Sequence, residues 1–136
     1  MSICQLDILS AKTLAIVEQH NACWARGDIA GIEALYHPDM VFIDHFSGNS
    51  HSGAALREHI RDIIARSSLE TLEYLDRPRV DGDTVFLRYC EVIRATNGDV
   101  LLSVSACDAV RIADGKIIEI NEYALPMHKP DQPQRK

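Results

Sequence analysis

The chain has 136 residues, 46% of them hydrophobic, and a formal net charge of −6. That length suits one domain with a full hydrophobic core, and the acidic balance argues against a nucleic-acid partner, which would need a basic stripe. No apolar run approaches the roughly 20 residues of a membrane span, and the first residues lack a signal-peptide pattern. We therefore expect a cytoplasmic protein without a membrane partner.

Two helices are expected in the first 40 residues. Apolar and aromatic side chains recur at helical spacing over residues 8–26; the repeating positions include Leu14, Ile16, Val17, His20 and Trp24. Gly27 suits the C′ position that ends this helix, and Asp28 suits the N-cap of a second, shorter helix. His37-Pro38 ends that second helix, because the residue before a proline avoids helical backbone angles.

A short strand, a loop and a third helix follow. Residues 40–46 read as a strand, and residues 47–53 read as a loop by their serine, glycine and asparagine content. Residues 54–67 form an amphipathic pattern, and its apolar face contains Leu56, Ile60, Ile63 and Ile64.

From about residue 70 the hydrophobic period changes to two, which predicts strands over residues 70–80, 83–95, 99–112 and 116–125. The connections contain Gly82, Gly98 and Gly115, each beside an aspartate or asparagine, which are strong hairpin signals. The polar, proline-rich residues 126–136 are expected to be loose. The chain is thus read as one domain over residues 1–136, with its core at about 8–125.

This order predicts an α+β fold in which three N-terminal helices cover one face of an antiparallel meander. A sheet that curves away from the helices leaves a cavity between the two layers, and such a cavity is the natural place for a ligand. The four cysteines form no C-x-x-C pair and are expected to be buried, reduced thiols; they are Cys4, Cys23, Cys90 and Cys107.

Acidic residues interrupt apolar strand faces. The even positions of the strand at 99–112 are apolar except for Asp108, and a charge on a buried face is costly unless it is paired or protonated. Asp108 therefore needs a partner, a raised pKa or a function. Asp44 shares a strand face with Met40, Phe42 and Phe46 in the same way.

Two glutamates extend the pattern. Glu122 shares a face with Ile118 and Ile120, whereas the strand around Glu91 is partly apolar on both faces, so alternation leaves its direction open. One such acid is often near a strand end or bridged to an arginine. Several on adjoining strands indicate a polar group set inside an apolar pocket.

His20 lies on the apolar face of the first helix, between Val17 and Trp24, and is either a core histidine or a site residue. His45, His51 and His59 match no metal-binding spacing. Nucleotide-binding and serine-hydrolase motifs are absent from the sequence. We expect neither a metal nor a cofactor.

The stretch from Trp24 to Ile60 carries a family resemblance. Its features are Gly27-Asp28, Leu35-Tyr36, Asp44 and the run from Gly53 through Leu56-Arg57-Glu58. These resemble the nuclear transport factor 2-like superfamily, in particular its SnoaL-like and ketosteroid isomerase branches, over roughly residues 10–125. The resemblance implies a cone-shaped fold whose curved sheet encloses a pocket for a hydrophobic small molecule.

In ketosteroid isomerases one strand aspartate moves a proton between carbons, and a second, protonated aspartate donates to the enolate oxygen. Asp44 and Asp108 fall on these two positions, whereas the isomerase's oxyanion tyrosine corresponds to His20 and a pocket tyrosine to about Ile60. The resemblance thus implies Asp44 as base, with Asp108 and His20 as donors, in isomerisation or aldol-type cyclisation of a hydrophobic carbonyl compound. The expected pocket residues are Trp24, Phe42, Ile60, Tyr89, Glu91 and Glu122.

Two alternatives stay open. Limonene-epoxide hydrolases, another branch, activate water with two aspartates and an arginine; Glu91 and Glu122 fall at the acid positions, and Tyr89 stands at the arginine position. A non-catalytic ligand-binding or association domain is the other alternative, which a pocket plugged by Trp24, Phe42 and Tyr89 would favour.

The resemblance also implies a homodimer formed through the outer face of the sheet. The odd positions Leu101, Cys107 and Ala109 would give that face a partly apolar surface.

Overall fold

The computed structural model describes residues 3–128, with the side chains of residues 8–68 and 72–125. The helices are α1 (Ile3–Ala25), α2 (Ile29–Leu35) and α3 (Gly53–Arg66). The strands are β1 (Tyr36–Asp44), β2 (Asn49–Ser52), β3 (Ser67–Tyr74), β4 (Arg79–Asp81), β5 (Thr84–Ala95), β6 (Val100–Ala113) and β7 (Lys116–His128). Among these residues no helix is long and apolar enough to cross a membrane.

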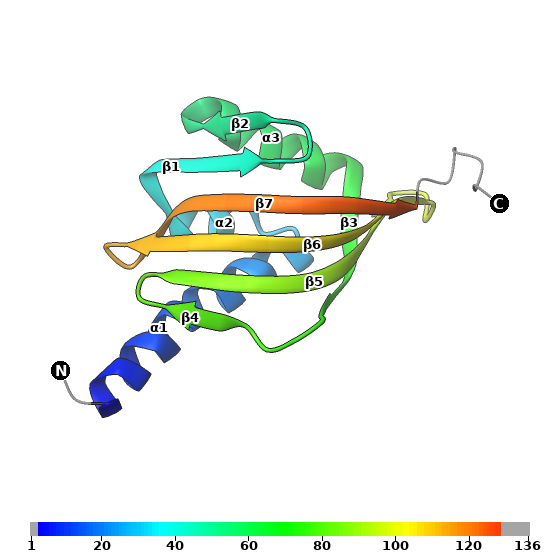
Figure 1. The fold of residues 1–136 in the computed structure, drawn as a ribbon. Helices are drawn as coiled ribbons and strands as arrows, with labels where there is room; N and C mark the ends of the chain where they lie inside the picture. The colour runs from blue at the N-terminus through cyan, green and yellow to red at the C-terminus, as the bar shows by residue number, and fades with distance from the viewer. Residues whose placement is uncertain (1–2, 129–136) are drawn as a thin grey trace.

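The strands form one seven-stranded sheet in the order β2-β1-β7-β6-β5-β3, and β4 pairs with β5 beside β3. All pairings are antiparallel except that of β1 with β7. The sheet curls, and the helices lie against one of its faces (Figure 1). The predicted α+β fold with helices covering a curved sheet is confirmed.

The connection between α1 and α2 follows the sequence signals. Gly27 has a φ of 68°, a left-handed conformation that glycine adopts without steric cost. Asp28 caps α2, because its Oδ1 accepts a hydrogen bond from the Gly31 N–H at 2.9 Å. The helix ends at Leu35, before His37-Pro38 as predicted, whereas α1 begins at Ile3 rather than at residue 8.

Two strand predictions were wrong. Residues 47–53 are not only a loop, because β2 pairs with β1 from Val41 opposite Ser52 to Asp44 opposite Asn49; an edge strand of polar residues carries no hydrophobic pattern that sequence could reveal. The strand expected over residues 70–80 is two strands. Pro78, which has no N–H for a ladder, lies in the break between β3 and β4.

The hairpin turns are confirmed, and one bulge changes a face prediction. Arg111 pairs with Glu119 and Ile112 with Ile117, so Ile118 is an extra residue in β7. Ile117 is fully buried and Ile118 is only half-buried. The expectation that Ile118 shares the inner face was therefore wrong, although the alternation is restored from residue 120 onward.

The even face of β6 is buried as predicted, from Val104 through Asp108 to Ile112. Three cysteines are free thiols, but only Cys23 is buried. Cys90 is half-buried and Cys107 is exposed, because Cys107 lies on the odd, outer face of β6. The expectation of burial was wrong for Cys107, and the side chain of Cys4 lies outside the described residues.

Candidate functional site

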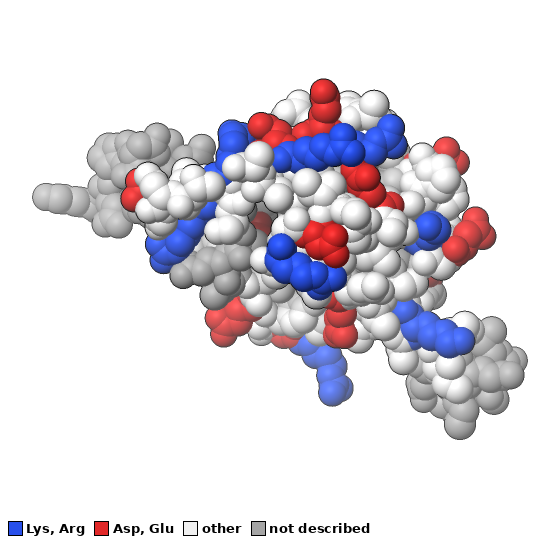
Figure 2. Space-filling view, turned by 180° about the vertical axis from the view of Figure 1, so that it is seen from behind, with Lys and Arg blue, Asp and Glu red and all other residues white. Residues whose placement is uncertain are grey.

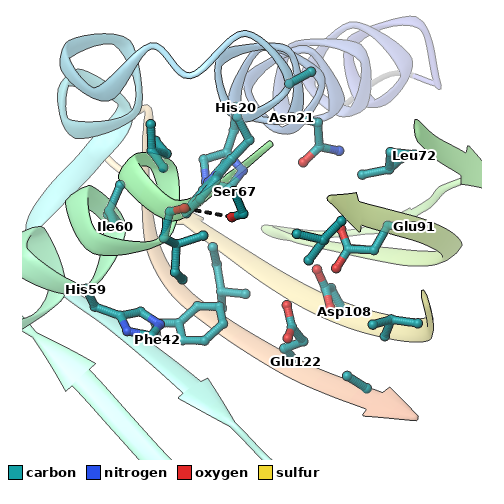
Figure 3. Close-up of a pocket in the computed structure, with 18 of the residues that line it drawn as sticks. His20, Asn21, Phe42, His59, Ile60, Ser67, Leu72, Glu91, Asp108 and Glu122 are labelled. Carbon is teal, nitrogen blue, oxygen red and sulfur yellow. Dashed lines mark hydrogen bonds between the residues drawn. The ribbon is translucent and has the colours of Figure 1, made fainter. Parts of the chain in front are cut away.

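A cavity of about 640 Å³ lies between the helices and the inner face of the sheet. Apolar and aromatic side chains form most of its wall. All nine residues that the sequence predicted for the site line this cavity: His20, Trp24, Phe42, Asp44, Ile60, Tyr89, Glu91, Asp108 and Glu122. Figure 3 shows His20 entering from α1, Ile60 from α3, and Glu91, Asp108 and Glu122 from the strands below.

Three carboxyl groups form a row across neighbouring strands. Asp44 on β1 lies opposite Glu122 on β7, and Glu122 lies opposite Asp108 on β6. Adjacent strands are about 4.8 Å apart, and like charges directly opposite each other are destabilising. The charges of Asp44 and Asp108 therefore oppose the ionisation of Glu122, which lies between them.

Asp108 is 8% exposed, and its two oxygens differ. Oδ2 accepts a hydrogen bond from the Tyr89 hydroxyl at 2.9 Å, whereas Oδ1 is buried without a partner among the described residues. Burial raises the pKa of Asp108 well above its usual range, the Tyr89 hydrogen bond opposes that rise, and the charge of Glu91 adds to it. A protonated Asp108 would present an O–H group to the cavity.

Glu122 and Glu91 are also shifted towards the protonated form. Burial raises the pKa of Glu122 strongly, and the charges of Asp108, Glu91 and Asp44 raise it further. Burial raises the pKa of Glu91 to about 7. Glu91 receives no hydrogen bond from the side chains that the structure describes. Glu91 lines the cavity, so its side chain, whose direction the alternation left open, points inward.

The Asp44 carboxyl group accepts hydrogen bonds from the turn that follows it. Its Oδ1 accepts hydrogen bonds from the N–H groups of Phe46 (2.9 Å) and Ser47 (3.3 Å), and its Oδ2 accepts one from the Ser47 hydroxyl (2.8 Å). These bonds hold the carboxyl group at the end of β1, on the border of the cavity. Both oxygens of Asp44 therefore already accept hydrogen bonds from this turn.

The opposite wall contains a neutral histidine. His20 Nε2 accepts a hydrogen bond from Trp24 Nε1–H at 3.1 Å and lies 2.8 Å from the Tyr36 hydroxyl. Because the indole nitrogen can only donate, we assign the ring hydrogen of His20 to Nδ1. Burial lowers the pKa of His20 to about 4, which keeps the ring uncharged at neutral pH. Any donation from His20 to a ligand would therefore come from Nδ1.

Sequence reasoning missed several polar residues of the cavity, among them Tyr36, His59 and Asn21. The expected end of the second helix at His37-Pro38 leaves Tyr36 inside that helix, whereas Tyr36 begins β1 and its hydroxyl lies 2.8 Å from His20 Nε2. His59 lines the cavity and stacks on His51 with ring centres 4.1 Å apart. Asn21 donates to the Tyr74 hydroxyl at 3.1 Å. The Leu35-Tyr36 pair was the available signal for Tyr36, whereas His59 and Asn21 lie on helix faces that carry no distinguishing pattern.

Known families give an independent comparison. The sequence matches the SnoaL-like domain family over residues 17–120. A search of curated proteins finds no match.

Solved structures share the fold. An M. tuberculosis LEH-like epoxide hydrolase is similar with a TM-score of 0.71 and 18% identity, covering 85% of this chain and 84% of that one. A proposed isomerase from Bacillus subtilis gives 0.70 and 20%, covering 86% and 88%. A Catenulispora acidiphila protein with a ketosteroid isomerase-like fold, in complex with trimethylamine, gives 0.67 and 16%, covering 79% and 83%. At these identities the likeness concerns the fold alone.

Proposed function

The chain belongs to the SnoaL-like domain family, and from this premise we propose that it is an acid–base enzyme acting on a hydrophobic carbonyl compound. The reaction would be an isomerisation or an aldol-type cyclisation. The observation that carries the proposal is Asp108: it is buried in the cavity wall, one oxygen accepts a hydrogen bond from Tyr89, and the other has no partner among the described residues. Asp108 lies directly opposite Glu122.

The proposed steps need one acid and one base. Asp108 keeps its proton and donates a hydrogen bond from Oδ1 to the carbonyl oxygen of the substrate, while the Tyr89 hydroxyl donates to Oδ2. A carboxylate takes the proton from the carbon next to the carbonyl; the C–H electron pair forms a C=C bond, and the C=O π pair moves to the oxygen, which becomes an enolate. When the C=O bond forms again, either the carboxyl group returns the proton to a different carbon, or the enolate carbon bonds to a second carbonyl carbon and the carboxyl group gives the proton to the oxygen of that carbonyl.

Two residues are candidates for the base. The family resemblance implies Asp44, but both of its oxygens accept hydrogen bonds from its own turn. We favour Glu122, because it lies directly opposite Asp108 and burial brings its pKa nearer to the working pH. The negative charge of Asp44 would then make Glu122 a stronger base, because it raises the pKa of Glu122. His20 would donate from Nδ1, as a second hydrogen-bond donor.

The test is hydrogen–deuterium exchange next to the carbonyl of hydrophobic cyclic ketones in D₂O, followed by mass spectrometry. We expect enzyme-dependent exchange with at least one ketone of the panel, and a loss of roughly 100-fold or more in Asp108→Asn and Glu122→Gln. Glu119→Gln is the matched control, because Glu119 lies on the same strand and pairs with Arg111 at 3.6 Å. Asp44→Asn separates the two base candidates.

Exchange at the buffer rate throughout the panel contradicts the proposed function. So does exchange at the wild-type rate in Asp44→Asn, Asp108→Asn and Glu122→Gln alike. A larger loss in Asp44→Asn than in Glu122→Gln assigns the base to Asp44.

A hydrolase is the second candidate, because the cavity also brings Glu91 near Asp108 and Glu122, and the fold resembles that of an epoxide hydrolase. Such a set could protonate an epoxide oxygen and deprotonate a water molecule. Solvent ¹⁸O in the product would favour it over proton transfer between carbons. A pocket plugged by Trp24, Phe42 and Tyr89 would have favoured a non-catalytic ligand-binding or association domain, whereas these side chains line a cavity of about 640 Å³.

A further inference from the structure

The charged groups around the cavity are unbalanced. Four acids line it: Asp44, Glu91, Asp108 and Glu122. Among the described residues that line it, Arg26 is the one lysine or arginine. Its guanidinium lies 3.2 Å from Asp28 Oδ2 and its side chain is 58% exposed, so its charge is compensated outside the cavity.

The other titratable groups of the lining do not supply a positive charge. Burial lowers the pKa of His20 to about 4. Burial and the neighbouring His51 lower the pKa of His59. Tyr36 and Tyr89 stay protonated and neutral, because burial raises the pKa of both phenols. The described lining therefore leaves its acids without a cation.

Two carboxyl groups point to where a ligand cation would lie. Glu91 on β5 faces the cavity without a hydrogen bond from any described side chain, and the mechanism proposed above does not use it. Asp108, on the adjoining strand, is buried, and its Oδ1 has no partner in the part of the chain that the structure describes. Figure 3 shows both carboxyl groups turned into the same space, below Asn21 of α1.

The rest of the wall suits the apolar part of such a ligand. Trp24, Tyr36 and Phe42 line the cavity, and aromatic faces attract cations as well as hydrocarbon. A buried carboxylate without a partner is destabilising, so a bound ammonium group would replace the proton that Glu91 otherwise keeps, while Asp108 keeps its own. An anionic ligand would face the opposite effect.

We propose that this cavity selects a hydrophobic ligand that carries a protonated amine, and that Glu91 binds the ammonium group beside Asp108. The inference rests on the proposed function only in taking the same cavity as the substrate site. It adds that the carbonyl compound bears a basic nitrogen, and that carboxylates and phosphates are rejected.

Three probes of equal size and different charge test this inference: 1-adamantylmethylamine, 1-adamantanemethanol and 1-adamantanecarboxylate. Trp24, the single tryptophan of the chain, lines the cavity and reports binding by its fluorescence. At about pH 8.5 we expect the amine to bind at least about tenfold more tightly than the alcohol, and the carboxylate most weakly. Towards about pH 5.5 this preference should fall to less than about threefold, because Glu91 gains a proton while the ammonium group keeps its charge.

Glu91→Gln should lower the affinity for the amine at least about tenfold at about pH 8.5 and change that for the alcohol less than about twofold. Glu119→Gln, on the outer side of β7, should change neither. Equal or tighter binding of the alcohol in the wild type overturns the inference, as does a failure of the amine to bind or an unchanged preference in Glu91→Gln.

The two proposals can fail separately. Hydrogen exchange on a ketone that depends on Asp108 and Glu122, without a preference for the amine probe, leaves the proposed function intact. It rules out selection for a ligand that carries an amine. Amine preference without exchange on any ketone does the reverse.

Discussion

Asp108 combines deep burial with an incomplete set of hydrogen bonds. A buried polar atom without a partner costs about 1–3 kcal/mol of stability, and more if it is charged. The protein tolerates this cost at Oδ1 while Tyr89 satisfies Oδ2. Protonation of Asp108 lowers the cost, and a ligand that bonds to Oδ1 would remove it. The hydrogen bonding of Oδ1 therefore affects the stability of the fold, the pH dependence of that stability and the binding of a ligand.

Glu122→Gln should stabilise the fold in a pH-dependent way. The folded state raises the pKa of Glu122 above its unfolded value, so ionisation opposes folding, and the penalty grows from about pH 5 to about pH 8.5. We expect the variant to exceed the wild type by roughly 1–3 kcal/mol at about pH 8.5 and to match it near pH 4.5. Urea unfolding at both pH values measures the difference. A variant that is less stable at the higher pH would contradict the raised pKa.

The site could be predicted residue by residue where side-chain alternation was clean. Asp108 and Asp44 stood out because their strand neighbours on the same face are apolar. The side that Glu91 faces could not be predicted, because both faces of β5 are partly apolar and only the register with β6 decides. Residue spacing also does not reveal the hydrogen bonds between Ser47 and Asp44. It does not reveal the contacts that assign the ring hydrogen of His20.

Helix α2 depends on the close approach of Gly31 to its cap. A Cβ at Gly31 would lie 2.5 Å from Asp28 Oδ2 and 2.8 Å from Cys23 Sγ. Sequence alone places Asp28 as N-cap, but it does not show that the Asp28 carboxylate and Cys23 Sγ of α1 occupy the space that a Cβ at position 31 would need.

Gly31→Ala should therefore destabilise the protein, although alanine is normally favoured over glycine inside a helix by about 1 kcal/mol. We expect a net loss of roughly 1–2 kcal/mol, because the new methyl group displaces the Asp28 carboxylate from the helix N-terminus. Thermal unfolding measures the sign. In an Asp28→Ala background the additional loss should be smaller, since the cap is already absent. A higher Tm in Gly31→Ala would show that the cap can move without cost.

Among the strands, predictability followed the strength of the local signal. The turns at Gly82, Gly98 and Gly115 have positive φ angles, which asparagine, aspartate and glycine favour, so the meander was predictable. Strand β2 has no hydrophobic pattern, and its pairing with β1 is a tertiary contact. The bulge at Ile118 depends on how β7 fits both β6 and β1, and no local pattern reveals it.

The two faces of the whole sheet differ in chemistry. The inner face holds the cavity, whereas the outer face exposes Phe86, Leu101, Tyr123 and Leu125. Exposed apolar residues in proximity often mark an association surface. On the helical side, basic and acidic side chains are interspersed without one broad basic area (Figure 2). The outer face of the sheet is therefore where we place the predicted homodimer contact.

Leu125→Lys should shift the protein from dimer towards monomer in sedimentation at micromolar concentration, because a charge would replace an apolar side chain that is 66% exposed in the single chain. Leu9→Lys is the matched control: Leu9 is 49% exposed on α1, away from the sheet's outer face. A wild-type protein that sediments as a monomer would rule out the dimer.

Retention of protons by carboxyl groups inside the cavity underlies both proposals, and carboxyl-carbon NMR measures it directly. In protein labelled with ¹³C at the aspartate and glutamate carboxyl groups, we expect at least two signals to titrate above about pH 6. One should disappear in Asp108→Asn and another in Glu122→Gln, with the signals of Glu119 unchanged. Titration of every carboxyl carbon below about pH 5.5 would show that Asp108 and Glu122 are ordinary ionised acids, and would contradict the acid–base site.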